Sequence, residues 1–326
     1  MFTFSCNNTE MNSCYIFSIK VGTVQLNLVR KIYEMSIHIL IFSLCIAAII
    51  AADHDVSHHP NWKYLDSEKC GYTRYQETKY KIVSGKAALL GEFPWIVRLG
   101  RKYRNFLFFD CAGTLINRYY VLTAGHCDKR DDVARLGENY NDSPVDCDAY
   151  ECAPGVQDIK VDKYLEFGFE PRTHYRDLML VKLREPAQFN EYVVPACLPK
   201  GPILKTDFLG KTVQIAGWGF SNVRTRYVPS NLQYIGAPVL SRQVCSNIFI
   251  NKLTESQMCI GFESGKDSCA GDSGGPVTKN LIVDGKRRHY LLGLVSYGMI
   301  NCGHGPAVYT NVSYYMKDIL DKIEKN

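Results

Sequence analysis

A single serine in the C-terminal half of the chain has the surroundings of a nucleophile. The stretch Lys266–Pro276 reads KDSCAGDSGGP and places Ser273 between Asp272 and two glycines. Glycine lets the backbone turn tightly and approach a bound substrate closely. The backbone N–H groups of Gly271 and Ser273 could then converge on the oxygen of an attacked carbonyl and stabilise its developing charge. A glycine-rich turn without chemistry is the alternative interpretation of this stretch alone.

Two further stretches supply the partners that a serine nucleophile needs. His126 lies in LTAGHC after an apolar stretch, and Asp177 precedes the apolar run 178–181. A histidine that takes the serine proton and an aspartate that orients the imidazole make a hydroxyl reactive toward carbonyl carbon. Taken singly, the histidine fits a buried structural residue and the aspartate fits a turn residue. The order His, Asp, Ser along the chain favours the catalytic interpretation.

In this order the motifs resemble those of the chymotrypsin-like (trypsin-like) serine proteases. The serine loop matches GDSGGP, TAGHC is similar to TAAHC, and DLMLV is similar to the aspartate motif of that family. Gly217-Trp218-Gly219 and the junction Lys81-Ile82-Val83 also match, and the resemblance covers residues 82–326. Several positions depart from the family pattern: Ser84 and Ala307 stand where glycine is usual, and Gly125 stands where alanine is usual.

The elements that position these residues are expected to be short strands. From residue 91 onward, short apolar runs alternate with turn signals, which is typical of an all-β barrel or sandwich. The resemblance implies a more specific all-β fold, two antiparallel six-stranded β-barrels with a C-terminal helix. Residues 312–323 carry apolar side chains at helical spacing and predict an amphipathic helix packed on the second barrel.

The N-terminal part of the chain divides into two segments ahead of the predicted peptidase domain, 82–326. Within 1–52, the apolar run 37–50 follows Arg30 and Lys31 and precedes small residues, which is the layout of a secretory signal peptide. Met35 is a candidate start of translation, and a signal anchor is the alternative. Residues 53–81 are polar and without period, and we expect an exposed pro-segment. With 46% hydrophobic residues and a net charge of +5, composition gives no reason to expect nucleic acid as a partner.

The cysteines indicate an oxidising compartment. Of 13 cysteines, ten lie beyond residue 52, and this even number predicts five disulfides without fixing their pairing. The resemblance implies the pairs Cys70–Cys197, Cys111–Cys127, Cys147–Cys152, Cys245–Cys259 and Cys269–Cys302. The first pair would keep residues 53–81 attached as a light chain after cleavage. The third pair resembles that of arthropod clip-type cascade proteases, although the clip module is not present here.

The resemblance also implies how the serine loop is activated. Cleavage after Lys81 frees the α-amino group of Ile82, which folds inward against Asp272. A buried carboxylate without a partner is strongly unfavourable, so the new ammonium organises the loop around it. The uncut chain lacks this partner, and its oxyanion site is expected to be poorly formed.

A specificity pocket follows from the same resemblance. Asp267 matches the base of the pocket, where a carboxylate pairs with the cation of an Arg or Lys substrate side chain. Ser268 can add a hydrogen bond beside it. The predicted walls are Ser296, Gly298 and Ala307, and the extra methyl group of Ala307 is expected to narrow the pocket.

Several weaker signals concern ions, glycans and charged surfaces. No cofactor is expected to be required, and structural calcium held by Glu138, Ser143 and Asp146 is an expectation drawn from the family. Asn141 and Asn311 begin glycosylation sequons. The basic clusters 101–104 and 286–289 are interpreted as solvated loops, with a macromolecular exosite and a polyanion patch as the respective alternatives.

Together these features predict a secreted, extracellular serine endopeptidase zymogen. It is expected to cut proteins after Arg or Lys in an extracellular cascade such as immunity, melanisation or clotting. Expected partners are protein substrates including other zymogens, an activating trypsin-like protease and serpin-type inhibitors, with neither nucleic acid nor stable membrane insertion. A digestive or venom enzyme and a protease-like binding protein that no longer cuts are the alternatives.

Overall fold

The computed structural model describes residues 38, 56–65, 68–75, 86–104, 106–127, 129–141, 143, 145–219, 228–261, 271–299 and 305–325. Two compact units are separated, Met1–Asp55 and Val56–Asn326. In the first unit His38 alone is described, so the architecture below is that of the second. Within the described ranges, no helix has the length and apolar character needed to cross a membrane.

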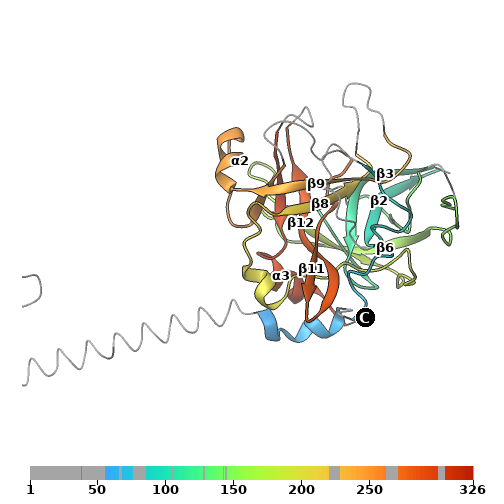
Figure 1. The fold of residues 1–326 in the computed structure, drawn as a ribbon, viewed down its shortest axis with the longest axis horizontal. Helices are drawn as coiled ribbons and strands as arrows, with labels where there is room; N and C mark the ends of the chain where they lie inside the picture. Colours follow the sequence, from blue (N-terminus) through green and yellow to red (C-terminus); the bar gives the residue numbers. More distant parts are fainter. Residues whose placement is uncertain are drawn as a thin grey trace, which may run out of the picture. The chain divides into compact units, whose positions relative to one another are not determined.

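The first half of the second unit forms a closed antiparallel barrel (Figure 1). Its strands follow the order β2-β3-β4-β7-β6-β5, and pairing of β5 with β2 closes it. Alternating inward side chains such as Val97 and Leu99 fill its core. The strands are β2 (Ile96–Tyr103), β3 (Phe106–Leu115), β4 (Tyr120–Thr123), β5 (Val133–Leu136), β6 (Gln157–Glu166) and β7 (Met179–Leu183).

A second antiparallel barrel follows in the chain. Strand β8 pairs with both β11 and β9, which closes the order β8-β9-β10-β13-β12-β11, and β1 (Lys86–Ala87) adds to β9. The two barrels confirm the predicted all-β, chymotrypsin-like fold. The strands are β8 (Thr212–Gly217), β9 (Gln233–Leu240), β10 (Gln257–Ile260), β11 (Pro276–Val283), β12 (Lys286–Tyr297) and β13 (Ala307–Asn311). The 3-10 helix η3 (Gly201–Lys205) precedes β8, and helix α2 (Arg242–Ile248) lies between β9 and β10.

The predicted C-terminal helix is present but shorter than expected. Helix α3 spans Met316–Lys322, while residues 312–315 form turns. All the apolar positions predicted for its buried face are buried. They join a core that takes Tyr120 and Leu180 from the first barrel and Leu291 and Leu294 from the second. The helix therefore packs on the second barrel as expected, and its apolar face also contacts the first barrel because it lies where the two barrels meet.

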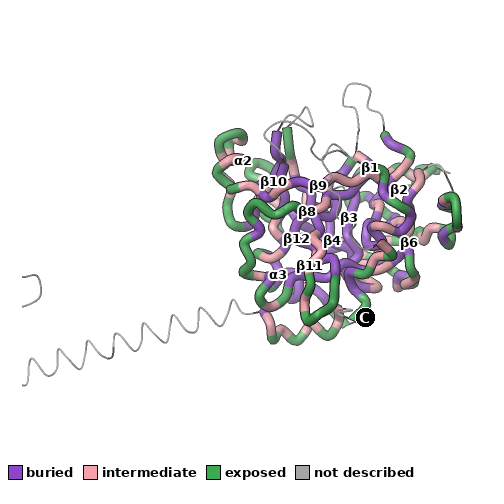
Figure 2. Tube along the Cα trace, in the orientation of Figure 1, coloured by how far each residue is buried: buried purple, intermediate pink, exposed green. Residues whose placement is uncertain are grey.

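The segment ahead of the barrels is packed against them, contrary to the expected exposed pro-segment. Its described residues, 56–65 and 68–75, are called here the light-chain segment. It contains the 3-10 helices η1 (Val56–His58) and η2 (Pro60–Tyr64), and Trp62, Tyr64 and Leu65 pack against the main core. In Figure 2 much of this segment is drawn as only partly exposed. Its few apolar side chains show no helical or strand period, so the sequence pattern did not predict that they would pack against the core.

The light-chain segment also completes the end of α3. The last carbonyls of a helix have no partner within the helix. The side-chain amide of Asn61 donates to the carbonyls of Leu320 and Ile323, at 2.9 Å and 3.0 Å. His59 Nε2 lies 2.9 Å from a carboxylate oxygen of Asp321. The segment therefore acts as a cap for the C-terminal helix.

A disulfide and two backbone hydrogen bonds fasten the other end of the light-chain segment. The predicted pair Cys70–Cys197 is present. Gly71 donates its N–H to the carbonyl of Pro195 at 2.7 Å and accepts from His289 at 2.9 Å. Gly71 has φ +70°, and a Cβ there would lie 2.6 Å from the His289 carbonyl, so only glycine fits.

Three more predicted disulfides are present: Cys111–Cys127, Cys147–Cys152 and Cys245–Cys259. The first ties strand β3 to the loop that carries His126. Cys269 and Cys302 lie outside the described residues, so their pairing stays a prediction.

His289 predicts how stability depends on pH. Burial, with a smaller contribution from Arg287, lowers its pKa from 6.5 to about 4. Because the unfolded chain then binds this proton more tightly, stability should fall as pH drops from about 6.5 to about 4. From about pH 7 to about pH 4.5 the loss is about 2.5 kcal/mol. In urea unfolding, the free energy of unfolding of His289→Gln should therefore fall by about 2.5 kcal/mol less than that of the wild type between these two pH values.

The exposed His58 provides the matched control. His58→Gln should keep the pH dependence of the wild type. An unchanged dependence in His289→Gln would show that its neutral, buried state does not govern stability.

Candidate active site

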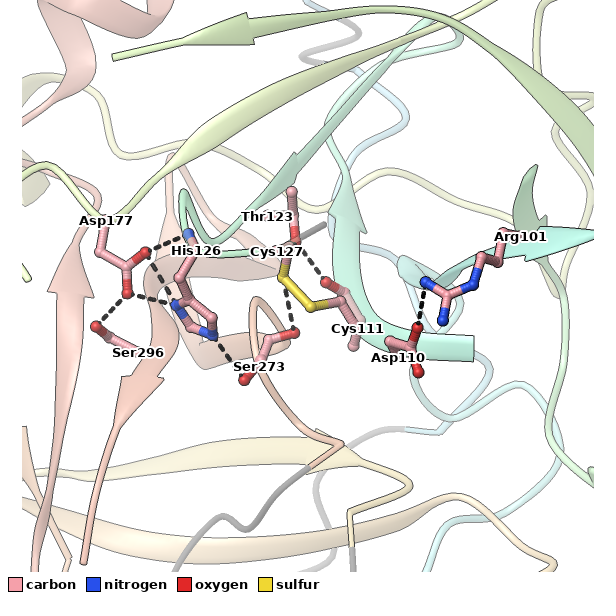
Figure 3. Close-up of a disulfide and its surroundings, with 10 residues drawn as sticks. Arg101, Asp110, Cys111, Thr123, His126, Cys127, Asp177, Ser273 and Ser296 are labelled. Atoms are coloured by element: carbon pink, nitrogen blue, oxygen red, sulfur yellow. Dashed lines mark hydrogen bonds and ion pairs between the residues drawn. A yellow bond between two sulfur atoms is a disulfide. The ribbon is translucent and has the colours of Figure 1, made fainter. Parts of the chain in front are cut away.

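The structure brings the three predicted reactive side chains into one hydrogen-bonded line (Figure 3). His126 Nε2 lies 2.9 Å from the hydroxyl of Ser273, and His126 Nδ1 lies 2.9 Å from Asp177 Oδ2. His126 follows β4 and Asp177 precedes β7, two paired strands of the first barrel. Ser273 precedes β11 of the second barrel. The line therefore spans the junction between the barrels.

The carboxylate of Asp177 is buried and surrounded by donors. It is 1% exposed. The backbone N–H of His126 donates to Oδ1 at 2.9 Å, and the hydroxyl of Ser296 donates to Oδ2 at 2.5 Å. Burial by itself raises the pKa of Asp177, but the hydrogen bonds and charge of His126 and the hydrogen bond from Ser296 outweigh it and lower the pKa. The carboxylate is therefore ionised at neutral pH and holds the Nδ1–H tautomer of His126.

Ser296 has a role that the sequence did not reveal. It was predicted as part of a wall of the specificity pocket that pairs with the substrate through backbone groups, and this stays a prediction. Its side chain is buried against Asp177, 119 residues away in sequence. A residue near the end of a strand can face either side, and the pattern around Ser296 does not say which. Gly298, two residues on, is exposed and keeps its place as a predicted wall residue.

The serine loop is folded as a tight turn with two available donors. Gly271 has φ +101°, and the N–H of Gly275 donates to the carbonyl of Asp272 at 2.8 Å. The Ser273 carbonyl accepts from the N–H of Ala112 at 2.8 Å, which fastens the loop to β3. No described residue accepts from the N–H of Gly271 or Ser273. Both remain available to a substrate oxygen.

Asp272 lies over the Gly217–Gly219 backbone. Its Oδ1 accepts from the N–H of Gly219 at 2.7 Å. A Cβ at Gly217 would lie 1.9 Å from this carboxylate, and one at Gly219 would lie 2.2 Å from it, so both glycines leave the space it occupies. Lys81 and Ile82 lie outside the described residues, so the predicted activation pair with Asp272 stays a prediction.

The departure at Gly125 has a packing reason. A Cβ at this position would lie 2.9 Å from Phe169 Cβ and 3.2 Å from the carbonyl of Arg176. Alanine would therefore force the loop before Asp177 to move. Because glycine has no Cβ, the loop can pack closely here while the His126–Asp177 hydrogen bonds stay intact.

An aromatic cluster borders His126 and was not found from the sequence. His174 stacks on Tyr297 with ring centroids 4.4 Å apart, and Phe169 lies 5.7 Å from His174. Burial, and to a lesser extent the charge of His126, lowers the pKa of His174 although Asp177 opposes this. His174 and Arg176 both have φ above +50°, a strained conformation for side-chain-bearing residues. The strain lies in the loop that positions Asp177.

The predicted pocket is partly outside the described residues. Asp267 and Ser268 fall there, so the base of the pocket stays a prediction. Ala307 is 1% exposed at the start of β13, paired with Ile260 of β10. Its methyl group is packed into the barrel wall that the family resemblance assigns to the pocket.

The proposed calcium ligands do not form a fitting donor set. Glu138 Oε2 accepts from Arg135 at 3.0 Å, and Asp146 Oδ2 accepts from the N–H groups of Asn139 and Tyr140. The Ser143 hydroxyl donates to the carbonyl of Val145. One buried oxygen of Glu138 and one of Asp146 have no partner, but calcium takes 6–8 oxygens. Among the described residues no group of three or more His, Cys, Asp or Glu side chains could hold a metal ion.

The two sequon asparagines are both engaged in hydrogen bonds. The amide nitrogen of Asn141 donates to the carbonyl of Pro229 at 3.0 Å, and that of Asn311 donates to the carbonyl of Glu255 at 2.9 Å. A glycan attaches to this nitrogen and would replace these contacts. Glycosylation at either site stays a prediction.

Ser296→Ala tests how the Asp177 carboxylate is stabilised. Loss of this hydrogen bond from a buried carboxylate should lower the free energy of unfolding at pH 7 by about 1–3 kcal/mol. The lowered pKa of Asp177 means that its ionised form adds stability above the unfolded pKa, and that this is lost as pH falls through the folded value. The difference between variant and wild type should therefore shrink toward about pH 2 in urea unfolding.

Thr310 provides a control because its side chain also hydrogen-bonds to Asp177, but at the backbone. Its hydroxyl donates to the backbone carbonyl of Asp177 at 2.6 Å, so Thr310→Val loses a buried hydrogen bond to a group that does not titrate. Its destabilisation should not vary with pH. A Ser296→Ala effect that is equally constant would contradict the assigned role.

Comparison with known proteins agrees with this geometry. The family model described as Trypsin matches residues 82–319. The chain is 34% identical over 280 residues to CLIP domain-containing serine protease HP8 of Bombyx mori, covering 80% of this chain and 73% of that protein. It is 34% identical to the Spaetzle-processing enzyme of Drosophila melanogaster, covering 75% of this chain and 66% of that protein.

A solved structure shows the same architecture. The crystal structure of the Drosophila Grass clip serine protease of the Toll pathway superposes with a TM-score of 0.71 at 29% identity. The match covers 81% of this chain and 78% of the other. The chain therefore belongs to the trypsin family of serine proteases.

Proposed function

We propose that this protein is a serine endopeptidase that hydrolyses peptide bonds by acyl transfer. The observation that carries the proposal is the hydrogen-bonded line Ser273–His126–Asp177. Ser273 Oγ bonds to the substrate carbonyl carbon as its proton passes to His126 Nε2, and the N–H groups of Gly271 and Ser273 stabilise the oxyanion. His126 then donates the proton to the leaving amine, and the C–N bond breaks.

Water completes the reaction by the same route. His126 takes a proton from the water as its oxygen attacks the acyl carbon, and returns a proton to Ser273 Oγ as the ester bond breaks. Asp177 stays ionised throughout and stabilises the imidazolium, in keeping with its lowered pKa. The products are the acid and amine halves of the substrate.

The chain is proposed to be a zymogen that cleavage after Lys81 activates. The α-ammonium of Ile82 is then the partner of the Asp272 carboxylate, which already lies against Gly219 beside the nucleophile. The disulfide Cys70–Cys197 and the docking of the light-chain segment keep that segment attached after the cut.

Substrates are proposed to be extracellular proteins cut after Arg or Lys. Asp267 supplies the carboxylate for the basic side chain, Ser268 a hydrogen bond, and Ala307 a narrowed wall. The similarity to CLIP-domain HP8 and to the Spaetzle-processing enzyme supports secretion and a place in a proteolytic cascade. Other zymogens are then substrates, a trypsin-like protease is the activator, and serpin-type inhibitors are the regulators.

Active-site labelling tests the peptidase proposal. The full chain, cut after Lys81, should react with an organophosphonate at Ser273, because the reagent needs an activated serine and a formed oxyanion site. Mass spectrometry of the uncut chain, the cut chain and cut Ser273→Ala measures this, with label expected mainly on the second. No label on the cut chain would show that the site is inert.

Asp267→Ser tests the specificity proposal separately. Loss of the carboxylate should lower kcat/KM for Arg and Lys peptides by about 10³-fold or more, because the buried cation of the substrate loses its partner. Labelling of Ser273 should persist in this variant. Retained cleavage after Arg, measured on a peptide library, would show that the pocket base lies elsewhere.

A further inference from the structure

A cavity beside the light-chain segment takes no part in the proposed chemistry. It has a volume of about 210 Å³ and lies between residues 71–75 and the hairpin of β11 and β12. We call it the tether cavity. Tyr72, Tyr75, Lys286, Arg287 and Arg288 form most of its wall, and none of Ser273, His126 and Asp177 lines it. Its basic residues come from the cluster 286–289, to which the peptidase reaction assigns no role.

The guanidinium of Arg288 is buried, and no described carboxylate serves as its counter-ion. Arg288 is 6% exposed and lies over the ring of Tyr72, 3.4 Å from its centroid. Its N–H groups donate to the carbonyls of Glu68 and Arg287, each at 3.3 Å. Among the described residues no carboxylate forms an ion pair with it. Carbonyls and an aromatic face stabilise a cation but leave its full charge in place.

Two exposed cations beside Arg288 also have no ion-pair partner among the described residues. Lys286 and Arg287 are exposed, and neither forms an ion pair with a carboxylate within the described part of the chain. Elsewhere cations do find partners: Arg135 lies 2.7 Å from Asp158, and Lys163 lies 3.1 Å from Glu324.

Acidic and neutral groups also lie near the cavity. Asp284 is exposed at the hairpin turn, and Glu68 is exposed on the light-chain segment. His289 and Asn280 also line the cavity, joined by a 3.1 Å contact between Nε2 and Nδ2. Their other polar atoms, Nδ1 and Oδ1, are buried without a partner among the described residues. The cavity thus combines three cations that have no ion-pair partner among the described residues with two buried polar atoms that lack hydrogen-bond partners there.

We propose that the tether cavity binds a sulfate ester group of an anionic polysaccharide. A guanidinium offers a fork of N–H donors to a tetrahedral oxyanion, and Lys286 adds a point charge. The volume is below the ~300–1,000 Å³ of drug-sized ligand sites, so it suits one anionic group and its sugar ring. Tyr72 is 50% exposed and leaves part of its ring for contact with a sugar.

A protein partner fits this cavity less well. Stable protein interfaces bury about 1,200–2,000 Å² with an apolar centre, whereas the features here are one small cavity and a short basic cluster. The proposal does not depend on peptidase activity, so inert Ser273→Ala protein can be used to test it.

Calorimetry with a size-defined heparin hexasaccharide tests the proposal. The probe is titrated into full-length Ser273→Ala protein at about 0.15 M salt. Adding Lys286→Ala and Arg287→Ala should raise Kd about tenfold or more, because two charge-assisted contacts are lost. Both side chains are exposed, so the fold should be retained, and Arg288 is left in place because it packs on Tyr72.

The matched control removes the same charge elsewhere on the second barrel. Lys211 and Lys252 are exposed and do not line the cavity. Lys211→Ala with Lys252→Ala should leave Kd within about twofold, because distant surface charges are screened at this salt concentration.

Five results would overturn the proposal, the first four concerning heparin, the control pair and other polymers. These four are no binding of heparin, equal weakening of binding by the control pair, equal affinity for fully desulfated heparin, and equal affinity for polyglutamate of the same charge. The last would assign the cavity to an acidic peptide. Inorganic sulfate that binds as tightly as the hexasaccharide would reduce the site to a simple anion site without a polysaccharide.

Discussion

The buried carboxylate of Asp177 makes the two barrels depend on each other. Taking a carboxylate out of water costs several kcal/mol unless hydrogen bonds replace the lost solvation. His126 supplies these bonds from the first barrel, and the hydroxyl of Ser296 supplies another from β12 of the second. The hydroxyl of Thr310 in β13 also holds Asp177, through its backbone carbonyl. Any shift of one barrel against the other leaves this charge under-solvated. The geometry of the reactive line is therefore tied to the packing of the whole domain.

The serine loop shows the same dependence from the other side. Ser273 belongs to the second barrel in sequence, but its carbonyl accepts from Ala112 of β3, and Cys111 is bonded to Cys127 beside His126. The disulfide thus fixes the histidine loop to the strand that also fastens the serine loop. Figure 3 shows this arrangement, with the disulfide next to the reactive line. A short loop can hold its nucleophile accurately because both barrels constrain it.

Residue types and their order were enough to predict an all-β fold and the reactive line, and the family resemblance added the two barrels and the pairing of the four disulfides that the structure describes. What the sequence could not predict depends on contacts between distant segments. Ser296 could face the pocket or Asp177, and only the packed structure decides this. Gly125 looked like a weakened motif until the position of Phe169 explained it. The light-chain segment looked exposed because three side chains without a period give no pattern, although they pack well once a surface is present.

The light-chain segment is connected to the site through a continuous set of contacts. Asn61 caps the end of α3, and the turn before this helix carries Tyr315, which is 1% exposed. The Tyr315 hydroxyl accepts from the N–H of Arg176 at 3.2 Å, and Arg176 directly precedes Asp177. Spatial continuity of this kind shows support, whereas regulation requires an element with two alternative arrangements. Each hydrogen bond in this set is formed in the single arrangement that the structure shows. The segment therefore acts as a structural part of the peptidase domain and holds the strained loop before Asp177 in place.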